Sequence, residues 1–376
     1  MQNLIYWSPF LGNVGTVKST INSAIAFKKF SKDKYNVQII NVFGEWNDYK
    51  EILKKFDIEL INLTFNYRNF LPKNGFVKSR ISYILIFLIS FIPLLKFLKK
   101  ENNSIFIAHL ITSLPLLINY IFKINSKIIL RISGFPKLHF LRKKFWQLTT
   151  KNIFLVTCPT EELMQNIIKF KILNTTKIRF LPDAIIDIKD FLNKKKTQIE
   201  LPTKKKFILA VGRLTRQKNY KYLLDEIKYF LLSNNDYDLI ILGDGEDKNA
   251  LEKQISDINL NGRIFILGYK KNPYAYMSKA RALVLSSLWE EVGFVIVESA
   301  LSNLLVFSSN CPNGPKEFLE NGRAGYLFNS NEKNALKNII DKVNSENYKR
   351  KIIAKKNCLK YTKFRHFKTF NNILST

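Results

Sequence analysis

Residues 282–325 read ALVLSSLWEEVGFVIVESALSNLLVFSSNCPNGPKEFLENGRAG and contain one complete strand–loop–helix unit. The four residues ALVL at 282–285 form a short apolar run that is typical of a buried parallel strand. The polar segment that follows carries Glu290 and predicts a loop. Beyond Gly293 a second apolar segment, residues 294–301, predicts a helix.

Two carboxylates follow this predicted strand. Glu290 and Glu298 lie eight positions apart, on either side of Gly293. A carboxylate after a parallel strand points into the crevice at the carboxyl edge of the sheet, where open α/β sheets bind ligands. A turn at Gly293 directs the N-terminus of the helix to the same crevice, which favours a phosphate. The alternative is an ordinary unit with surface glutamates.

The segment resembles the donor site of retaining, family-four glycosyltransferases with the two-domain GT-B fold. That family carries two glutamates at this spacing on either side of a Gly-Phe pair, which is Gly293 and Phe294 here. The downstream block CPNGPKEFLENGRAGYLF, residues 311–328, is similar to the family's segment after the next strand. Glu317 in this block is expected to steady the loop.

The first glutamate departs from the commoner pattern of that family. The family usually places Gly-Phe directly after it, whereas Glu291 and Val292 intervene in this chain. We take Glu290 as the equivalent position because its spacing to Glu298 is retained.

The length and composition favour two domains and a basic protein. A chain of 376 residues is too long for one typical core, and 46% of it is hydrophobic, enough to give each half a core. The formal net charge is +30. Such a charge suits nucleic acid, an anionic membrane or an anionic substrate, and it also arises when a lysine-rich composition covers solvated faces without a dedicated partner.

The cysteines and the N-terminus predict a cytoplasmic protein. The three cysteines, Cys158, Cys311 and Cys358, have no metal-ligand spacing and indicate a reducing compartment. The start MQNLIYWSPF has neither a basic region nor a long apolar run, so we do not expect a signal peptide.

The N-terminal segment predicts a strand–loop–helix turn. Residues 3–7 form the strand, the loop SPFLGNVG spans 8–15, and residues 16–30 have helical spacing. Gly12 and Gly15 allow backbone N–H groups to approach an anion at the helix start. In the resembled family this loop faces the donor diphosphate; a plain turn is the alternative.

A long apolar stretch, residues 81–98, lies between basic residues. It is short for a bilayer span and contains Pro93. A buried helix is the first interpretation, and a membrane-surface helix with basic flanks toward anionic lipid is the second. A spanning helix is the third.

Three polar residues follow predicted strands of the N-terminal half. His109 follows a strand at 104–108, and Arg131 ends a strand at 127–132 with Lys137 shortly beyond it. The resemblance implies that a histidine near this place contacts the donor sugar or the acceptor in some members, although a structural role is the alternative. Arg131 and Lys137 suit an acceptor phosphate or, alternatively, ion pairs.

Alternating strands and helices predict an α/β protein of two Rossmann-like, doubly wound domains. The resemblance adds that the domains face each other across a cleft and that the C-terminal helix crosses back to the first domain. We expect an N-terminal acceptor-side domain at 1–185, a linker at 186–206, a donor-binding domain at 207–345, and helices at 346–376 that pack back on the first domain. The turn Pro182-Asp183-Ala184 resembles the family's linker turn, which usually has asparagine at the middle position.

The C-terminal half opens with a strand at 207–211 and the loop GRLTRQKN at 212–219. This loop strongly resembles the family's donor-phosphate loop. A turn at Gly212 brings Arg213 and Lys218 to the start of the next helix, and two fixed cations stabilise a leaving diphosphate without a metal. The later sequence GDGE, 243–246, is interpreted as a turn and helix start and not as a metal motif.

The resemblance implies a metal-independent transfer of a sugar, with retention, from a nucleotide-sugar to a saccharide or lipid-linked acceptor. UDP-sugars are the family's usual donors. Glu298 is expected to hold the ribose, Glu290 to lie near the donor sugar, and the N–H groups of Gly293 and Phe294 to bind sugar or phosphate. We expect no cofactor, no metal and no nucleic acid partner, with peripheral contact to an anionic membrane.

The sequence suits two rival functions less well. A basic nucleic-acid or anionic-surface binding protein requires basic and aromatic residues interleaved on one face or a known motif, and the sequence contains neither. Another enzyme of the same fold, such as a nucleotide-sugar epimerase or a phosphorylase, lacks the paired-glutamate block or needs a cofactor lysine.

Overall fold

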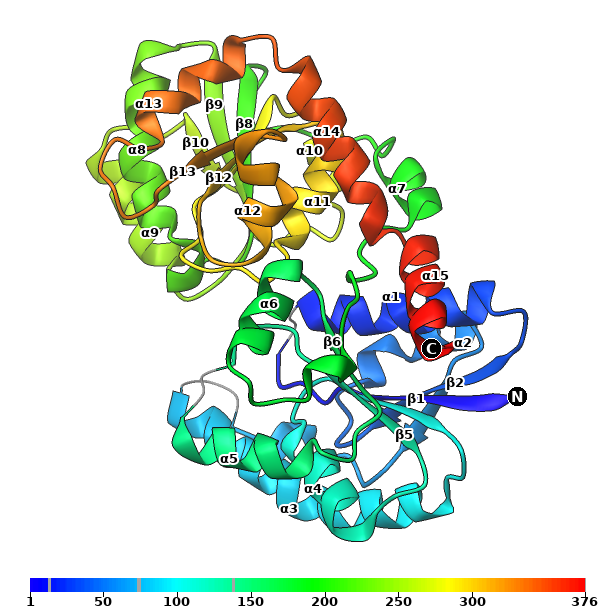
Figure 1. Ribbon diagram of the computed structural model, residues 1–376. Coiled ribbons are helices and arrows are strands. Elements are labelled where there is room, and N and C mark those ends of the chain that lie inside the picture. The colour runs from blue at the N-terminus through cyan, green and yellow to red at the C-terminus, as the bar shows by residue number, and fades with distance from the viewer. Residues whose placement is uncertain (13–14, 73–75, 137–138, 376) are drawn as a thin grey trace. The chain divides into compact units, whose positions relative to one another are not determined.

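Strands and helices alternate along most of the chain in the computed structural model, which describes residues 1–12, 15–72, 76–136 and 139–375, without the side chains of 76–79. The chain divides into unit 1, residues 1–184 with 363–376, and unit 2, residues 185–362. Each unit is built around its own parallel sheet (Figure 1).

Unit 1 contains a seven-stranded parallel sheet in the order β3-β2-β1-β4-β5-β6-β7. Its strands are β1 (Gln2–Trp7), β2 (Tyr35–Asn41), β3 (Glu59–Asn62), β4 (Ile105–Ala108), β5 (Lys127–Arg131), β6 (Leu155–Cys158) and β7 (Ile178–Phe180). Its helices are α1 (Gly15–Phe30), α2 (Lys50–Lys55), α3 (Phe76–Lys100), α4 (Ser113–Phe122), α5 (Phe140–Thr149), α6 (Glu161–Lys169) and α15 (Lys363–Ser375).

Unit 2 contains a six-stranded parallel sheet in the order β10-β9-β8-β11-β12-β13. Its strands are β8 (Lys206–Val211), β9 (Tyr237–Leu242), β10 (Ile264–Ile266), β11 (Ala282–Leu285), β12 (Leu305–Ser309) and β13 (Tyr326–Phe328). Its helices are α7 (Ile188–Lys194), α8 (Tyr220–Ser233), α9 (Lys248–Asp257), α10 (Tyr274–Met277), α11 (Phe294–Leu301), α12 (Gly314–Phe318), α13 (Lys337–Ile340) and α14 (Tyr348–Cys358).

Both sheets are covered by helices on their two faces, which explains why the central strands are mostly apolar at successive positions. In β8, Phe207 and Leu209 pack with residues of α7, α10 and α11, whereas Ile208 and Ala210 pack with residues of α8 and α9. Alternate residues of a strand point to opposite faces, so a strand between two helical layers needs apolar residues at every position. The prediction of two Rossmann-like, doubly wound units is confirmed.

The boundaries of the units differ from the predicted ones. The segment expected to be a linker, 186–206, forms part of unit 2, where α7 buries Phe191 with its ring edge against Tyr274 at 5.2 Å between centroids. Lysines on the exposed side of this short helix gave it the composition of a linker, while one aromatic residue fixes it to the core.

The last helices also divide differently from the expectation that all of 346–376 packs on the first domain. Helix α14 belongs to unit 2 and contacts α11, and only α15 belongs to unit 1. Helix α15 lies along α1 (Figure 1), where Phe367 and Phe370 each approach the ring of Phe27 edge-on at 5.3 Å.

Candidate active site

The predicted donor residues of unit 2 gather at the carboxyl ends of β8 and β11. These neighbouring strands form the point where the strand order reverses, because the chain continues outward through β9 and β10 on one side and through β12 and β13 on the other. Loops at such a point diverge and leave a crevice in which open α/β sheets bind ligands. The GRLTRQKN loop follows β8, and the Glu290 loop follows β11.

Backbone contacts hold these two loops together. The N–H of Leu288 donates to the carbonyl of Gln217 at 2.8 Å, and the Gln217 side chain donates to the carbonyl of Trp289 at 2.9 Å. The hydroxyl of Ser286 donates to the carbonyl of Lys218 at 2.8 Å. The two loops therefore form one polar unit, although 72 residues separate Gln217 from Trp289.

Lys218 and Glu290, both predicted as catalytic residues, form an ion pair with each other. The ammonium Nζ lies 2.5 Å from Oε1 of Glu290, and the hydroxyl of Ser287 donates to the same oxygen at 2.6 Å. The side chains of Lys218 and Glu290 are only 15% and 8% exposed. The pair places a positive and a negative group side by side at the edge of the sheet.

The other predicted residues of the phosphate loop lie on its solvent side or against its backbone. Arg213 is exposed, and its guanidinium donates to the Gln217 side chain at 3.4 Å. A Cβ on Gly212 would lie 3.1 Å from Cε of Lys218, so this glycine leaves room for the lysine chain beneath the loop.

The GDGE turn supports the phosphate loop from behind. A Cβ on Gly243 would lie 1.8 Å from the carbonyl oxygen of Gly212, and one on Gly245 would lie 2.3 Å from that of Leu214. The N–H of Leu214 donates to the carbonyl of Asp244 at 2.9 Å, and α9 begins directly after Asp247. The turn-and-helix-start interpretation of this sequence agrees with the structure.

The Glu290 loop is fixed by the NGP sequence at the start of α12, a role that the sequence analysis did not assign. The side-chain amide of Asn313 donates to the carbonyl of Glu290 at 3.3 Å, and the N–H of Gly314 donates to that of Glu291 at 2.6 Å. A Cβ on Gly314 would lie 2.3 Å from the latter oxygen. The asparagine–glycine pair before a proline was the available signal.

Gly293 forms the N-cap of α11 with φ 73°, a left-handed conformation that favours glycine. Phe294 is the first residue of that helix. The predicted turn between the loop and the helix is therefore present, and the N-terminus of α11 follows directly after the Glu290 loop.

Glu298 lies apart from Glu290, in the middle of α11, and contacts a different side chain. It is buried, and the hydroxyl of Tyr274 on α10 donates to its Oε1 at 3.4 Å. Burial and the charge of Glu298 raise the pKa of Tyr274, so this phenol keeps its proton and remains a donor. Sequence reasoning missed Tyr274, which a short aromatic helix, YAYM, supplies.

In unit 1, His109 follows β4 beside the first β-strand. It is buried, and its Nδ1 lies 3.2 Å from the hydroxyl of Thr20 on α1. Its Nε2 is buried without a hydrogen-bond partner among the described residues. Burial, and then the charge of Arg131, lower the pKa of His109 to about 3, so its imidazole is neutral at physiological pH.

The predicted glycines of unit 1 border a part of the chain outside the described residues, 13–14. Gly12 is exposed and has open space around its Cα, and Gly15 is the first residue of α1. Lys137 lies outside the described residues as well.

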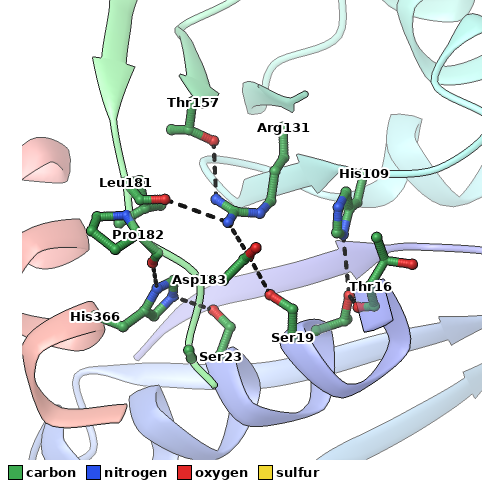
Figure 2. A network of polar contacts seen from close by, with 12 residues as sticks. Thr16, Ser19, Ser23, His109, Arg131, Thr157, Leu181, Pro182, Asp183 and His366 are labelled. Atoms are coloured by element: carbon green, nitrogen blue, oxygen red, sulfur yellow. Dashed lines mark hydrogen bonds and ion pairs between the residues drawn. The ribbon is translucent and has the colours of Figure 1, made fainter. Parts of the chain in front are cut away.

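Arg131 forms a buried ion pair with Asp183, which matches the ion-pair alternative for this arginine (Figure 2). The hydroxyl of Ser19 donates to the same carboxylate at 2.5 Å, and the guanidinium also reaches the hydroxyl of Thr157 and the carbonyl of Leu181 at 3.5 Å. Burial alone would raise the pKa of Asp183, but the Arg131 charge and the Ser19 hydrogen bond hold it below its ordinary value.

His366 links α15 to this network (Figure 2). Its Nδ1 lies 2.6 Å from the carbonyl of Pro182, which can only accept, so Nδ1 donates. Its Nε2 lies 2.7 Å from the hydroxyl of Ser23, which in turn bonds the hydroxyl of Tyr6 at 2.8 Å. A single neutral imidazole satisfies every one of these contacts, and burial together with Arg131 lowers the pKa of His366 to about 4.

The model of the family described as glycosyl transferases group 1 matches residues 192–358. An uncharacterised glycosyltransferase of Methanocaldococcus jannaschii is 30% identical over 245 residues, which cover 60% of each chain. A protein of Escherichia coli named UDP-Gal:alpha-D-GlcNAc-diphosphoundecaprenol alpha-1,3-galactosyltransferase is 28% identical over 295 residues, 72% of this chain and 73% of the relative.

Solved structures with the same fold cover the entire chain. A glycosyltransferase of Rickettsia africae has a TM-score of 0.76 at 17% identity and covers 100% of this chain and 99% of its own. The Anabaena protein HepE, in complex with UDP and glucose, has a TM-score of 0.72 at 16% identity and covers 100% of both chains.

The match to the archaeal relative spans only 60% of that protein's length. The region matched by the family model contains the phosphate loop, both glutamates and the NGP sequence, whereas His109 and the Arg131–Asp183 pair lie outside it. Residues 192–358 thus match the glycosyl transferases group 1, and the fold of both units is of the GT-B type found in solved glycosyltransferase structures.

Proposed function

We propose that this protein transfers a sugar from a nucleotide-sugar to a hydroxyl of a saccharide or lipid-linked acceptor, in the synthesis of a bacterial surface polysaccharide. The observation that carries this proposal is the Lys218–Glu290 pair, held at the reversal point of the unit 2 sheet beside the N-terminus of α11. The site offers cations and N–H groups to a diphosphate, and it offers carboxylates to hydroxyl groups. A nucleotide-sugar contains both a diphosphate and sugars that carry hydroxyl groups.

The donor diphosphate is the group that this edge of the sheet binds best. When the bond between the anomeric carbon and the phosphate oxygen breaks, its electron pair leaves with the diphosphate, which gains negative charge. Lys218 and Arg213 supply positive charge to that group, and the first turn of α11 supplies N–H groups. In this proposal the phosphates compete with Glu290 for the Lys218 ammonium, which frees the Glu290 carboxylate to accept hydroxyl groups of the donor sugar.

The two glutamates have separate roles in the proposal. Glu290 lies near the donor sugar and stabilises the positive charge that develops at the anomeric carbon. Glu298 binds the ribose hydroxyls, and Tyr274 orients its carboxylate through the 3.4 Å hydrogen bond. The acceptor oxygen then forms the new bond to the anomeric carbon, and its proton passes to the departing diphosphate.

We further propose UDP-sugars as donors, retention of configuration, and a transfer that needs no metal. The Escherichia coli relative is named for a UDP-Gal donor and an alpha-1,3 product, and the Anabaena structure was solved with UDP and glucose. In UDP-galactose the sugar is itself alpha-linked, so an alpha product corresponds to retention. The cations of the phosphate loop take the place that a metal has on the diphosphate in other transferases.

The names of the same relatives support a proposal for the acceptor and the compartment. The Escherichia coli protein and a Campylobacter jejuni protein, 26% identical over 220 residues, are both named for acceptors on diphospho-undecaprenol carriers. We propose that this chain acts on such a lipid-linked saccharide at the cytoplasmic side of the membrane.

The test is a thermal-shift screen of nucleotide-sugars followed by a transfer assay with the donor that stabilises the protein most. Glu290→Ala is expected to abolish transfer and to leave the protein folded. Glu246→Ala, at an exposed acid of the neighbouring turn, serves as the control and is expected to retain transfer. Full turnover by Glu290→Ala with the correct donor would contradict the assignment.

A further inference from the structure

Helix α3 of unit 1 presents two different apolar faces. One face carries a residue at every fourth position that is 0% exposed, namely Ser82, Ile86, Ser90, Leu94 and Leu98. Three of these side chains belong to the core of unit 1. This face is the one that a helix of a soluble protein is expected to bury.

The opposite face of α3 is apolar as well, and it is exposed. Five aliphatic side chains spaced three or four positions apart, or adjacent, form a row along it, with exposed fractions between 38% and 64%: Ile81, Ile84, Leu85, Leu88 and Ile92. Helices that lie on a protein surface carry polar residues on that side, and single exposed aliphatic residues are common but continuous rows are not. We call these five residues the outer row.

The outer row ends in a basic region. Lys96 and Lys99 continue its spacing toward the C-terminus of α3, and the Lys99 ammonium lies 5.1 Å from the ring centroid of Phe122 at the end of α4. Lys123 follows immediately and is exposed.

The surrounding sequence is almost free of negative charge. Between residues 60 and 160 the chain contains fifteen lysines and arginines and one acidic residue, Glu101. A partner that matches this part of unit 1 therefore has an apolar surface with negative charge. A second copy of the same face does not match, because it would bring like charges together.

The burial of α3 defines how it can meet a membrane. Among the described residues it is the one helix that is long and apolar enough to cross a bilayer. Of its most apolar stretch of 18 residues, 28% is buried. Its inner face is part of the core, so the helix cannot enter a bilayer on all sides without unfolding unit 1. A helix with a packed inner face and an apolar outer face with lysines at one end fits the surface of a bilayer.

We propose that the outer row of α3 docks unit 1 onto an anionic lipid bilayer. Ile84, Leu88 and their neighbours enter the boundary between head groups and acyl chains, and the lysines at the end of α3 and α4 contact the lipid phosphates. This inference does not depend on the proposed transfer, because docking needs no donor. It does bring unit 1 to the place where a lipid-linked acceptor resides.

The experiment is co-sedimentation of the full chain with vesicles, without any nucleotide-sugar. Wild type is expected to bind vesicles of equal parts phosphatidylcholine and phosphatidylglycerol more tightly than vesicles of phosphatidylcholine alone, and salt is expected to weaken the binding. The double variant Ile84→Glu, Leu88→Glu is expected to bind the anionic vesicles about tenfold more weakly or worse. Leu232→Glu, at a 61% exposed leucine of α8 in unit 2, is the matched control and is expected to bind as wild type does.

The charges are tested by a second variant and the fold by a second measurement. Lys96→Gln with Lys99→Gln is expected to lower the preference for anionic over neutral vesicles several-fold while binding to neutral vesicles is retained. UDP-induced thermal stabilisation reports on unit 2 and is expected to be equal in all variants, so that a failure of docking is distinct from a failure of the proposed function.

Two outcomes would overturn the proposal. Absence of vesicle binding by wild type at low salt is one. The other is a dimer in light scattering that Ile84→Glu, Leu88→Glu dissociates while vesicle binding is unchanged, since the outer row would then be an interface between copies of this chain.

Discussion

Each unit holds a cation–carboxylate pair after the strands of its parallel sheet, and the two pairs differ in what surrounds them. In unit 1, Arg131 and Asp183 have side chains 7% and 4% exposed, and Ser19, Thr157 and Leu181 of the same unit add further hydrogen bonds to the pair. In unit 2, Lys218 and Glu290 are less buried, and Ser287 is the one further side chain bonded to their contacting atoms among the described residues.

The difference separates a structural pair from a functional one. The Arg131 guanidinium is 7% exposed and already bonds Asp183, Thr157 and Leu181, so burial keeps a ligand away from it. A lysine has three donors, and the Glu290 contact uses one of them. We infer that the unit 1 pair maintains the fold, whereas the unit 2 pair binds the donor.

The largest effect is expected where the Arg131–Asp183 pair of unit 1 is broken. Asp183→Ala leaves a buried guanidinium without its counter-charge, and we expect the unfolding free energy of unit 1 to fall by about 3–5 kcal/mol. Glu290→Ala, at the less buried pair, is expected to cost clearly less. Denaturant unfolding followed separately in each unit measures both. Equal losses for the two variants would remove the distinction between the pairs.

The two buried histidines near the Arg131–Asp183 pair are expected to make the stability of unit 1 depend on pH. In the folded protein the pKa of His366 is lowered to about 4, whereas the unfolded chain takes up this proton near pH 6.5. The contribution of neutral His366 is thus complete above pH 6.5 and is lost as the pH falls toward 4, which amounts to about 3 kcal/mol. His109, with a pKa lowered to about 3, acts in the same direction, and Asp183 adds a loss only below about pH 4.

This pH dependence is checked by urea unfolding at a series of pH values. His366→Asn retains a donor to the Pro182 carbonyl and removes the titrating group, so its stability is expected to fall less steeply between pH 6.5 and 4. A variant with the same slope as wild type would show that His366 does not carry the effect.

The Lys218–Glu290 pair of unit 2 is expected to control the rate of transfer. Lys218→Ala removes a cation from the leaving diphosphate, and we expect kcat/KM to fall about 10²-fold or more, or about 3 kcal/mol. Lys221→Ala, at an exposed lysine of α8, is the control and is expected to be unaffected. Steady-state kinetics with the preferred donor decides this, and an unchanged kcat/KM in the first variant would place the phosphates elsewhere.

The smallest effect on transfer is expected at Tyr274, in the same unit as the Lys218–Glu290 pair. Tyr274→Phe removes the hydroxyl that donates to Glu298 and keeps the ring that packs on Phe191. Because this hydrogen bond is long, at 3.4 Å, we expect it to contribute about 1 kcal/mol, less than a short bond to a carboxylate, and the donor KM to rise about fivefold with little change in kcat. A fall in kcat with an unchanged KM would indicate that Glu298 acts on the reacting carbon and not on the nucleoside.

The sequence predicted local features well and long-range contacts poorly. The strand, loop and helix around Glu290, the left-handed Gly293 and the turn after β9 follow from residues close together in the chain. The Lys218–Glu290 contact depends on β8 and β11 being neighbours in the sheet, which residue types alone do not reveal. For the same reason the sequence assigned these two residues to different parts of the donor without pairing them.

The errors at the unit boundaries have a related cause. Composition averages over a segment, so the lysines of 186–206 outweighed the single buried Phe191 that fixes α7. Likewise, the final helices resemble each other in composition, but the buried Ala354 packs α14 in unit 2, whereas His366 and Phe370 pack α15 in unit 1.

The central claim, that the Lys218–Glu290 edge of unit 2 binds the diphosphate of the donor, is tested most directly by titration calorimetry with UDP. Wild type and Lys221→Met are expected to bind UDP with the same affinity, and Lys218→Met is expected to bind it at least about tenfold more weakly. Binding of UDP by Lys218→Met with the affinity of wild type would contradict the account.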